Sequence, residues 1–187
     1  MACNVPLVAV SNDPCAKVAY GRQIVAILYQ DSAGDAPTLT TESAAQAAMT
    51  AVGADKLFIL NNVAASDVAD PSDQLLSGND VPYGASELTD RTRTVTGRLQ
   101  YPAAATHTAV NALNSRGGTL RTWLLDDQGY LQGPIENASL VFGVFKRPGI
   151  GQAIPAHYPL TLTYNSIAEP AISAAALPHI KSLVNAA

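Results

Sequence analysis

The chain has 187 residues, a formal net charge of −4 and only 14% charged residues. This length suits a single domain, and we expect residues 1–187 to form one. The 11 basic residues are scattered along the chain, which argues against tight nucleic-acid binding and against a polybasic membrane patch. The low charge favours a subunit that packs against copies of itself, because interface cores are depleted in charged residues.

The first half of the chain contains three short apolar segments and one helical pattern. Residues 5–10 are an apolar run that ends in turn residues. Residues 22–29 are rich in β-branched side chains and predict a strand. Residues 41–52 carry small apolar side chains at helical spacing and stop at Gly53, which predicts a helix. Residues 56–60 predict another short strand.

Residues 61–90 combine many aspartates with glycine and proline and show no apolar periodicity. We therefore expect a long loop there. Loops of this length inside a compact domain are usually functional or disordered. In an assembling protein such a loop would contact a neighbouring subunit, and in an enzyme it would serve as a lid.

The second half has clearer patterns. Residues 91–101 alternate strictly between two faces, as expected of a half-buried antiparallel strand. Residues 106–114 predict a helix after Pro102, and the tail is expected to be helical after Pro178. Further strands are predicted in three segments, residues 119–125, 140–147 and 157–165.

Together these patterns predict an α+β fold, mainly an antiparallel β-sandwich or barrel of seven or eight strands with one or two flanking helices. Two of the strands, residues 140–145 and 158–164, carry few of the charges that block edge pairing. We expect them to offer open sheet edges to neighbouring copies.

The three histidines are His107, His157 and His179. Their spacing matches no zinc-binding motif, and we expect them to be solvated surface residues. The alternative is a hydrolase in which His107 or His157 binds a metal or acts as a general base. Its site would be assembled from residues that are distant in sequence.

Other polar groups have simpler explanations than catalysis. Asp126-Asp127 precedes a Gln-Gly pair between two apolar runs and indicates a hairpin turn. The acidic residues of 61–90 lack the ligand spacing of a calcium loop. Cys3 and Cys15 match no metal or redox motif and are expected to be reduced thiols. We therefore predict no catalytic, cofactor-binding or metal-binding residues and no enzymatic activity.

Threonines form an uncharged face on two of the predicted strands, in residues 92–96 and 161–163. Such a face suits an ordinary exposed sheet or the wall of a channel.

Several of these segments together resemble the tail tube (major tail) proteins of tailed bacteriophages and of contractile injection systems. The resemblance covers roughly residues 91–165. It is carried by the strand RTRTVTGRLQY and the helix after it, by the hairpin LRTWLLDDQGY, and by the strands LVFGVF and YPLTLTY.

The resemblance implies a small β-sandwich or barrel whose copies form stacked rings around a DNA channel. The partners would be other copies and other virion proteins, without sequence-specific DNA binding or a membrane, and the location would be the virion after assembly in the host cytoplasm. A capsid decoration, head fibre or tail-completion protein would share most of these features. A carbohydrate-binding β-sandwich using Trp123, Tyr130 and Tyr158 is a further alternative.

Overall fold

The computed structural model describes residues 23–76, 87–116, 119–147, 149, 155–166 and 168–186. Within these ranges, six antiparallel strands close into a barrel and a seventh short strand flanks it. This confirms the predicted α+β class with a mainly antiparallel sheet. The strands are β1 (Ile24–Asp31), β2 (Phe58–Leu60), β3 (Val63–Leu76), β4 (Glu87–Gln100), β5 (Leu120–Asp126), β6 (Leu131–Phe142) and β7 (His157–Asn165). The helices are α1 (Glu42–Thr50), α2 (Ala104–Ser115) and α3 (Pro178–Ala186), and a short 3-10 helix, η1, spans Gly53–Asp55.

The barrel is weakest where β1 meets β3. Leu60 at the end of β2 pairs with Ile27, but β3 contributes only one pair to β1, Ala65 with Ile24. Between β2 and β3, Asn62 adopts a left-handed backbone conformation with a φ of 55°. Strands β2 and β3 therefore lie one after the other along the same side of β1. The break between them leaves a seam in the barrel wall.

The barrel interior is a packed apolar core rather than a pore. Side chains that alternate along each strand fill it, among them Ile27, Val95, Leu160 and Leu162, each no more than 2% exposed. Gly97 lies opposite Ala65 in this wall, and a Cβ at this position would come within 2.6 Å of the Ala65 backbone.

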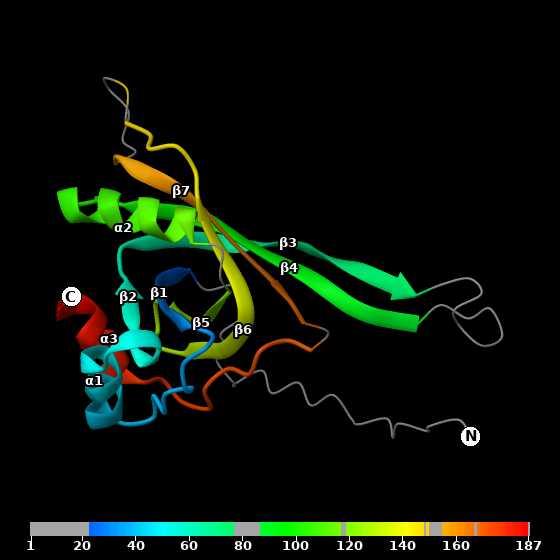
Figure 1. Cartoon of the computed structure of the whole chain (residues 1–187), viewed down its shortest axis with the longest axis horizontal. Helices are drawn as coiled ribbons and strands as arrows, with labels where there is room; N and C mark the ends of the chain where they lie inside the picture. Colours follow the sequence, from blue (N-terminus) through cyan, green and yellow to red (C-terminus); the bar gives the residue numbers. More distant parts are fainter. Residues whose placement is uncertain are drawn as a thin grey trace.

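A second apolar core lies on the outer face of β1 and β5, under α1 and α3 (Figure 1). Because β1 and β5 are covered on both faces, their sequences are continuous apolar runs rather than alternating ones. Ala45 and Ala48 of α1 are buried here, and their small size allows the helix to approach the sheet closely. The side chain of Thr41 caps α1 by accepting a hydrogen bond from the Ala44 amide, as its position before the apolar stripe predicts.

Helix α2 covers the part of β6 that β5 does not reach. Val110 of α2 is buried in the barrel core. The Asn114 side chain donates to the Phe142 carbonyl and accepts from the Phe142 amide, both at 2.9 Å. This amide satisfies the backbone of β6 in place of a neighbouring strand.

Three sequence predictions need correction. Residues 61–90 are not a long loop over the described part: β3 occupies Val63–Leu76 and β4 begins at Glu87, while residues 77–86 lie outside the described ranges. The predicted strand 140–147 is the end of a longer β6, which stops at Phe142 and leaves Val144 84% exposed. Residues 5–10 also lie outside the described ranges.

The third correction concerns the expected sheet edges. Strand β7 pairs with β4 on one side and β6 on the other, and β6 pairs with β5 and β7. Residues 158–164 therefore lie within the closed barrel. Residues 140–142 pair with β7 on one side, but their other side lies beyond the last β5 pair, at Ala138, and is bound at Phe142 by the Asn114 side chain. A lack of charge does not identify an edge strand when both neighbours are supplied by the same chain.

Candidate assembly interface

The strands β3 and β4 extend beyond the barrel as a long two-stranded arm (Figure 1). Their pairing runs from Val63–Leu99 to Leu76–Glu87. Strand β7 pairs with β4 only as far as Thr92, and β1 reaches only Ala65. From Ser66 on β3 and up to Arg91 on β4, the two strands have only each other as strand partners among the described residues.

Among the described residues, the arm therefore has two open edges of unequal length. At about 3.3 Å per residue, the edge of β3 from Ser66 to Leu76 spans on the order of 35 Å, and the edge of β4 from Glu87 to Arg91 spans on the order of 16 Å. Such edges expose rows of backbone N–H and C=O groups that can pair with another chain. Pro71 lies within β3, and proline in a sheet is found on edge strands, where a missing N–H breaks no internal ladder.

A cross-strand ion pair fixes the register of the arm. Arg91 and Asp73 are directly opposite, and the guanidinium donates to both carboxylate oxygens, at 2.6 Å from Nε and 3.3 Å from Nη2. Asp90 accepts a hydrogen bond from the Arg91 amide at 2.8 Å. Register matters here because a one-residue slip would exchange the two faces of the arm.

Arg93 anchors the arm where it leaves the barrel. Its side chain is buried, donates to the Ser166 carbonyl at 3.3 Å and pairs with Glu169 at 3.2 Å. The Ser166 amide also donates to the Arg91 carbonyl at 2.9 Å. The base of the arm is thus tied to the segment that follows β7.

The predicted threonine faces meet on the outer surface of the barrel. In the ladder between β4 and β7, Thr94 lies opposite Thr163 and Thr96 lies opposite Thr161. Ser139 of β6 continues the first of these rows. This uncharged three-stranded surface is larger than either sequence segment indicated alone.

The histidines are less exposed than the sequence analysis expects. His107 is half-buried, hydrogen-bonds to the Tyr158 hydroxyl and packs edge-on against Phe145 at 5.1 Å. His157 donates from Nδ1 to the Pro155 carbonyl at 2.8 Å, and His179 donates from Nε2 to the Leu39 carbonyl at 3.0 Å. All three rings are half-buried rather than fully exposed: distant segments contact His107 and His179, whereas His157 bonds to a residue two positions away.

The two aspartates of the hairpin turn serve that turn. Asp126 accepts hydrogen bonds from the amides of Gln128 and Tyr130, at 2.9 and 2.8 Å. Asp127 is exposed. Within the described ranges, no three histidine, cysteine or acidic side chains come together as a metal-binding group. Cys3 and Cys15 lie outside those ranges.

The aromatic residues of the carbohydrate hypothesis do not form one platform. Trp123 is 3% exposed in the core under the helices, and Tyr158 is 7% exposed in the barrel core. Tyr130 is half-buried near the hairpin turn. Trp123 and Tyr158 lie on opposite sides of the barrel wall, so their rings cannot stack on one sugar.

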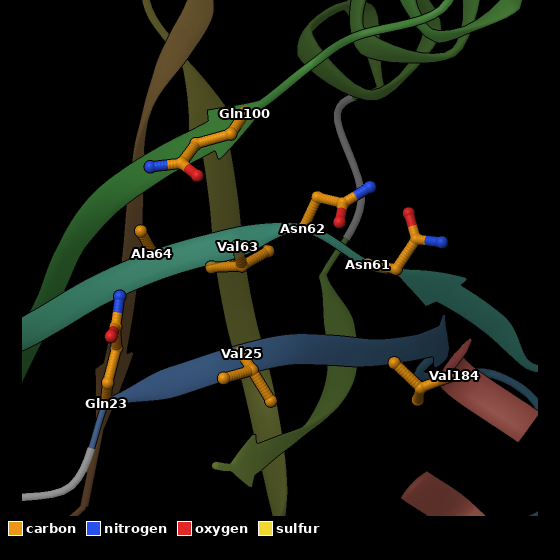
Figure 2. Close-up of a pocket in the computed structure, with 8 residues that line it drawn as sticks. All are labelled: Gln23, Val25, Asn61, Asn62, Val63, Ala64, Gln100 and Val184. Atoms are coloured by element: carbon orange, nitrogen blue, oxygen red, sulfur yellow. The ribbon is translucent and has the colours of Figure 1, made fainter. Parts of the chain in front are cut away.

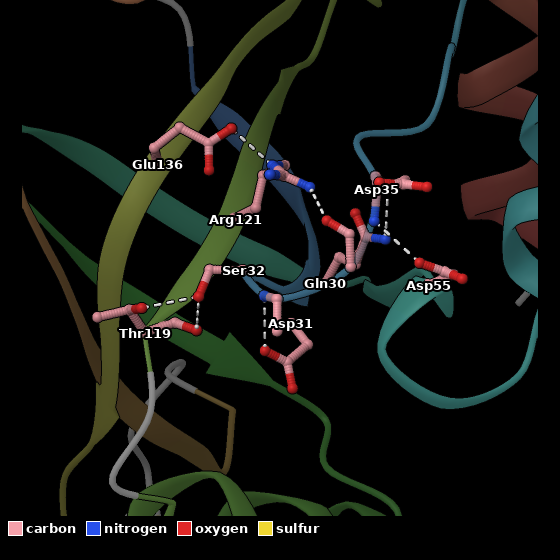
Figure 3. A network of polar contacts seen from close by, with 10 residues as sticks. Gln30, Asp31, Ser32, Asp35, Asp55, Thr119, Arg121 and Glu136 are labelled. Atoms are coloured by element: carbon pink, nitrogen blue, oxygen red, sulfur yellow. Dashed lines mark hydrogen bonds and ion pairs between the residues drawn. The ribbon is translucent and has the colours of Figure 1, made fainter.

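A network of polar contacts ties the end of β1 to β5 and β6 (Figure 3). Arg121 donates to Glu136 at 2.6 Å and to the Gly34 carbonyl at 2.7 Å. Asp31 pairs with Arg116, and the Ala33 amide donates to it at 3.0 Å. The Ala33 hydrogen bond and, to a smaller extent, Arg116 lower the pKa of the Asp31 carboxyl. These contacts fix a connection and converge on no reacting group.

The seam between β1 and β3 forms a shallow cleft of about 390 Å³ (Figure 2). Its polar lining consists of carboxamides, Gln23, Asn61, Asn62 and Gln100. A carboxamide does not titrate and is a weak nucleophile, so this lining offers neither general acid–base nor nucleophilic chemistry. In the part of the chain that the structure describes, no helix is long and apolar enough to cross a membrane.

Comparison with known proteins assigns no family. No protein-family model matches the chain, and no curated protein matches its sequence. Among solved structures, similar chains occur in the virion of a native gene transfer agent particle and in the tail of an empty gene transfer agent particle with C6 symmetry.

The first of these chains is 16% identical with a TM-score of 0.32, and the likeness covers 62% of this chain and 85% of that one. The second is 15% identical with a TM-score of 0.31, and the likeness covers 61% and 80%. These scores are too low for either likeness to support an argument about this chain.

Proposed function

We propose that the chain is a non-catalytic structural subunit of a phage-like virion, and that it is the tail tube protein whose copies form stacked rings around a DNA channel. The observation that carries the proposal is the contrast between a closed, filled barrel and an arm with two open edges. A barrel without edges needs no partner, whereas the arm has unpaired backbone over much of its length among the described residues.

Pairing of the arm with a second copy would satisfy that backbone by strand addition. If the arm pairs with a different surface of the next copy, repeated contacts generate a ring when the rotation closes and an open tube when it does not. Both geometries occur in a tube of stacked rings. An arm that binds another copy instead of its own barrel would therefore be able to build such a tube.

The uncharged threonine face supports a channel. Polyanions bind proteins largely through phosphate neutralisation by lysine and arginine. The rows around Thr94, Thr96 and Thr161 present hydroxyl and methyl groups instead, and the first base on this face of β4 is Arg98, two positions beyond Thr96. A wall of this chemistry would let DNA pass without holding it.

The experiment is negative-stain electron microscopy with sedimentation velocity over a range of protein concentrations. We expect rings or tubes with a central channel. In a truncated variant, an Asn-Gly turn replaces residues 73–91, which retains every β4–β7 pair from Thr92 onward. Because β3 from Ser66 to Ser72 stays in this variant, it should fold but need a higher concentration than the wild type to assemble.

Asp127→Ala is the matched control, because it alters an exposed residue of the other hairpin turn and leaves the arm intact. It should assemble as the wild type does. A wild-type protein that stays monomeric at every concentration would refute the proposal. Solid or spherical assemblies without a channel would instead favour another virion component, such as a capsid decoration.

A further inference from the structure

The formal charges of the chain are segregated between its two ends. The two strands of the arm, residues 66–76 and 87–91, carry five acidic residues by sequence against the single base Arg91. This excess of four negative charges equals the net charge of the whole chain, −4. The remainder of the protein is formally neutral.

The opposite end of β4 is surrounded by segments without any acidic residue. Residues 92–116 cover the rest of β4 and α2, and residues 137–166 cover the end of β6 and β7. Neither stretch contains aspartate or glutamate, while they carry five basic residues: Arg93, Arg98, Arg116, Lys146 and Arg147.

Three of these bases form a basic end, which we define as Arg98, Lys146 and Arg147. All three are exposed. Lys146 is joined to His157 by backbone hydrogen bonds, and His157 lies opposite Gln100 at the end of β4. Among the described residues none of the three has an ion-pair partner, whereas Arg93 and Arg116 are paired with Glu169 and Asp31.

The basic end also presents apolar surface. Val144 is 84% exposed and Tyr101 is 69% exposed, next to the three bases in sequence. Arg147 lies over the ring of Phe145 at 5.8 Å, so its guanidinium is held near this surface. Apolar groups beside unpaired charges are typical of an interface that a partner covers.

The far end of the arm is distant from the basic end of the same molecule. Asp90 and Arg98 are on the same strand, eight positions apart, or about 26 Å at 3.3 Å per residue. This separation exceeds the screening length of about 10 Å at ordinary salt. Asp67 is nearer, because Ala64 on its strand pairs with Arg98. A second copy can bring the far end of the arm to the basic end.

We infer that the acidic arm of one copy binds the basic end of the next copy, in a head-to-tail contact. This inference rests on the proposed self-assembly and adds the partner surface and the direction of the contact. Complementary charge selects this contact over arm-to-arm pairing, because two acidic arms repel each other.

Charge exchange tests the contact. Lys146→Glu with Arg147→Glu should raise the concentration needed for assembly by about tenfold or more, since it places like charges opposite each other. Glu87→Lys with Asp90→Lys should do the same from the arm. Combining all four substitutions should restore assembly to within about threefold of the wild type, because the opposite signs then face each other again.

Lys56→Glu with Lys181→Glu is the matched control, because it makes the same charge change away from the basic end. It should assemble at the wild-type concentration. Circular dichroism of each variant as a monomer checks folding. Rising salt should weaken the assembly of the wild type, and sedimentation velocity measures this change.

The outcomes separate the two proposals. If the wild type never assembles, both the proposed function and this contact are refuted. If the wild type assembles and the Lys146/Arg147 variant does so equally well, the contact is wrong and self-assembly stands. If each double variant fails and the fourfold variant also fails while folded, the basic end and the arm do not face each other.

Discussion

The barrel and the arm are built from the same kind of strand but depend on different partners. In the barrel, β7 has a strand on each side and side chains such as Leu160 and Leu162 are buried. In the arm, each strand has one strand partner among the described residues, and the register is held by the Asp73–Arg91 pair. Under the proposed function, folding and assembly reside in separable parts of the molecule, and substitutions should affect one without the other.

The largest effect should come from the barrel core. Leu162→Ala removes a fully buried side chain and leaves a cavity, which should lower the free energy of unfolding by about 2–5 kcal/mol. Urea denaturation followed by circular dichroism measures it. Thr163→Ala, the neighbour on the outer face, is the control and should change stability much less. Equal losses at both positions would mean that the barrel is not packed as described.

A smaller loss is expected where a side chain replaces a strand. Asn114→Leu removes the two hydrogen bonds to Phe142 and should cost about 1–3 kcal/mol of unfolding free energy, because a backbone N–H and C=O lose their partners. The same denaturation experiment applies. Asn111→Leu, on an exposed position of the same helix, should be close to neutral. A neutral Asn114→Leu would show that water replaces the side chain without penalty.

The arm should contribute little to the stability of the monomer. Asp73→Ala breaks a partly exposed ion pair, so the expected loss is below about 1 kcal/mol. The same variant should raise the amide hydrogen exchange of β3 beyond Ser66 in the monomer while leaving β7 unchanged. A loss comparable to that of Leu162→Ala would contradict the separation of barrel and arm.

The smallest effect concerns pH. The folded-state pKa of Asp31 is lowered, first by the Ala33 amide and then by Arg116. Its contribution to stability is therefore present above the unfolded pKa, about 4 for aspartate, and is lost as the pH falls through the folded value. Asp31→Asn should be slightly less stable than the wild type at neutral pH, and the difference should vanish in acid. A difference that persists in acid would show that the carboxylate charge is not its cause.

Strict alternation was the most informative sequence signal. It placed β7 at residues 157–165 with the bounds that the structure has, because a half-buried strand must alternate. The cap at Thr41 and the hairpin turn at Asp126 were also predictable, since each depends on a few neighbouring residues. The α+β class follows from these local features.

The arm was missed for a physical reason. Strand β3 contains Asp67, Asp70 and Pro71, residues that normally disfavour strands, and its order depends on a partner far along the chain. Edge positions were assigned to β6 and β7 because their sequences lack charge, yet whether a strand is an edge depends on the whole topology. The half-buried His107 was missed because the ring of Phe145 reaches it from a distant segment.

The central claim is that the open edges of the arm are completed by another copy. Amide hydrogen exchange, compared between dilute monomer and concentrated protein, tests it most directly. The account predicts that β7 is protected in both samples, whereas β3 from Ser66 to Leu76 exchanges quickly when dilute and becomes protected on assembly. Protection of that segment in the dilute monomer, or rapid exchange within assembled particles, would contradict it.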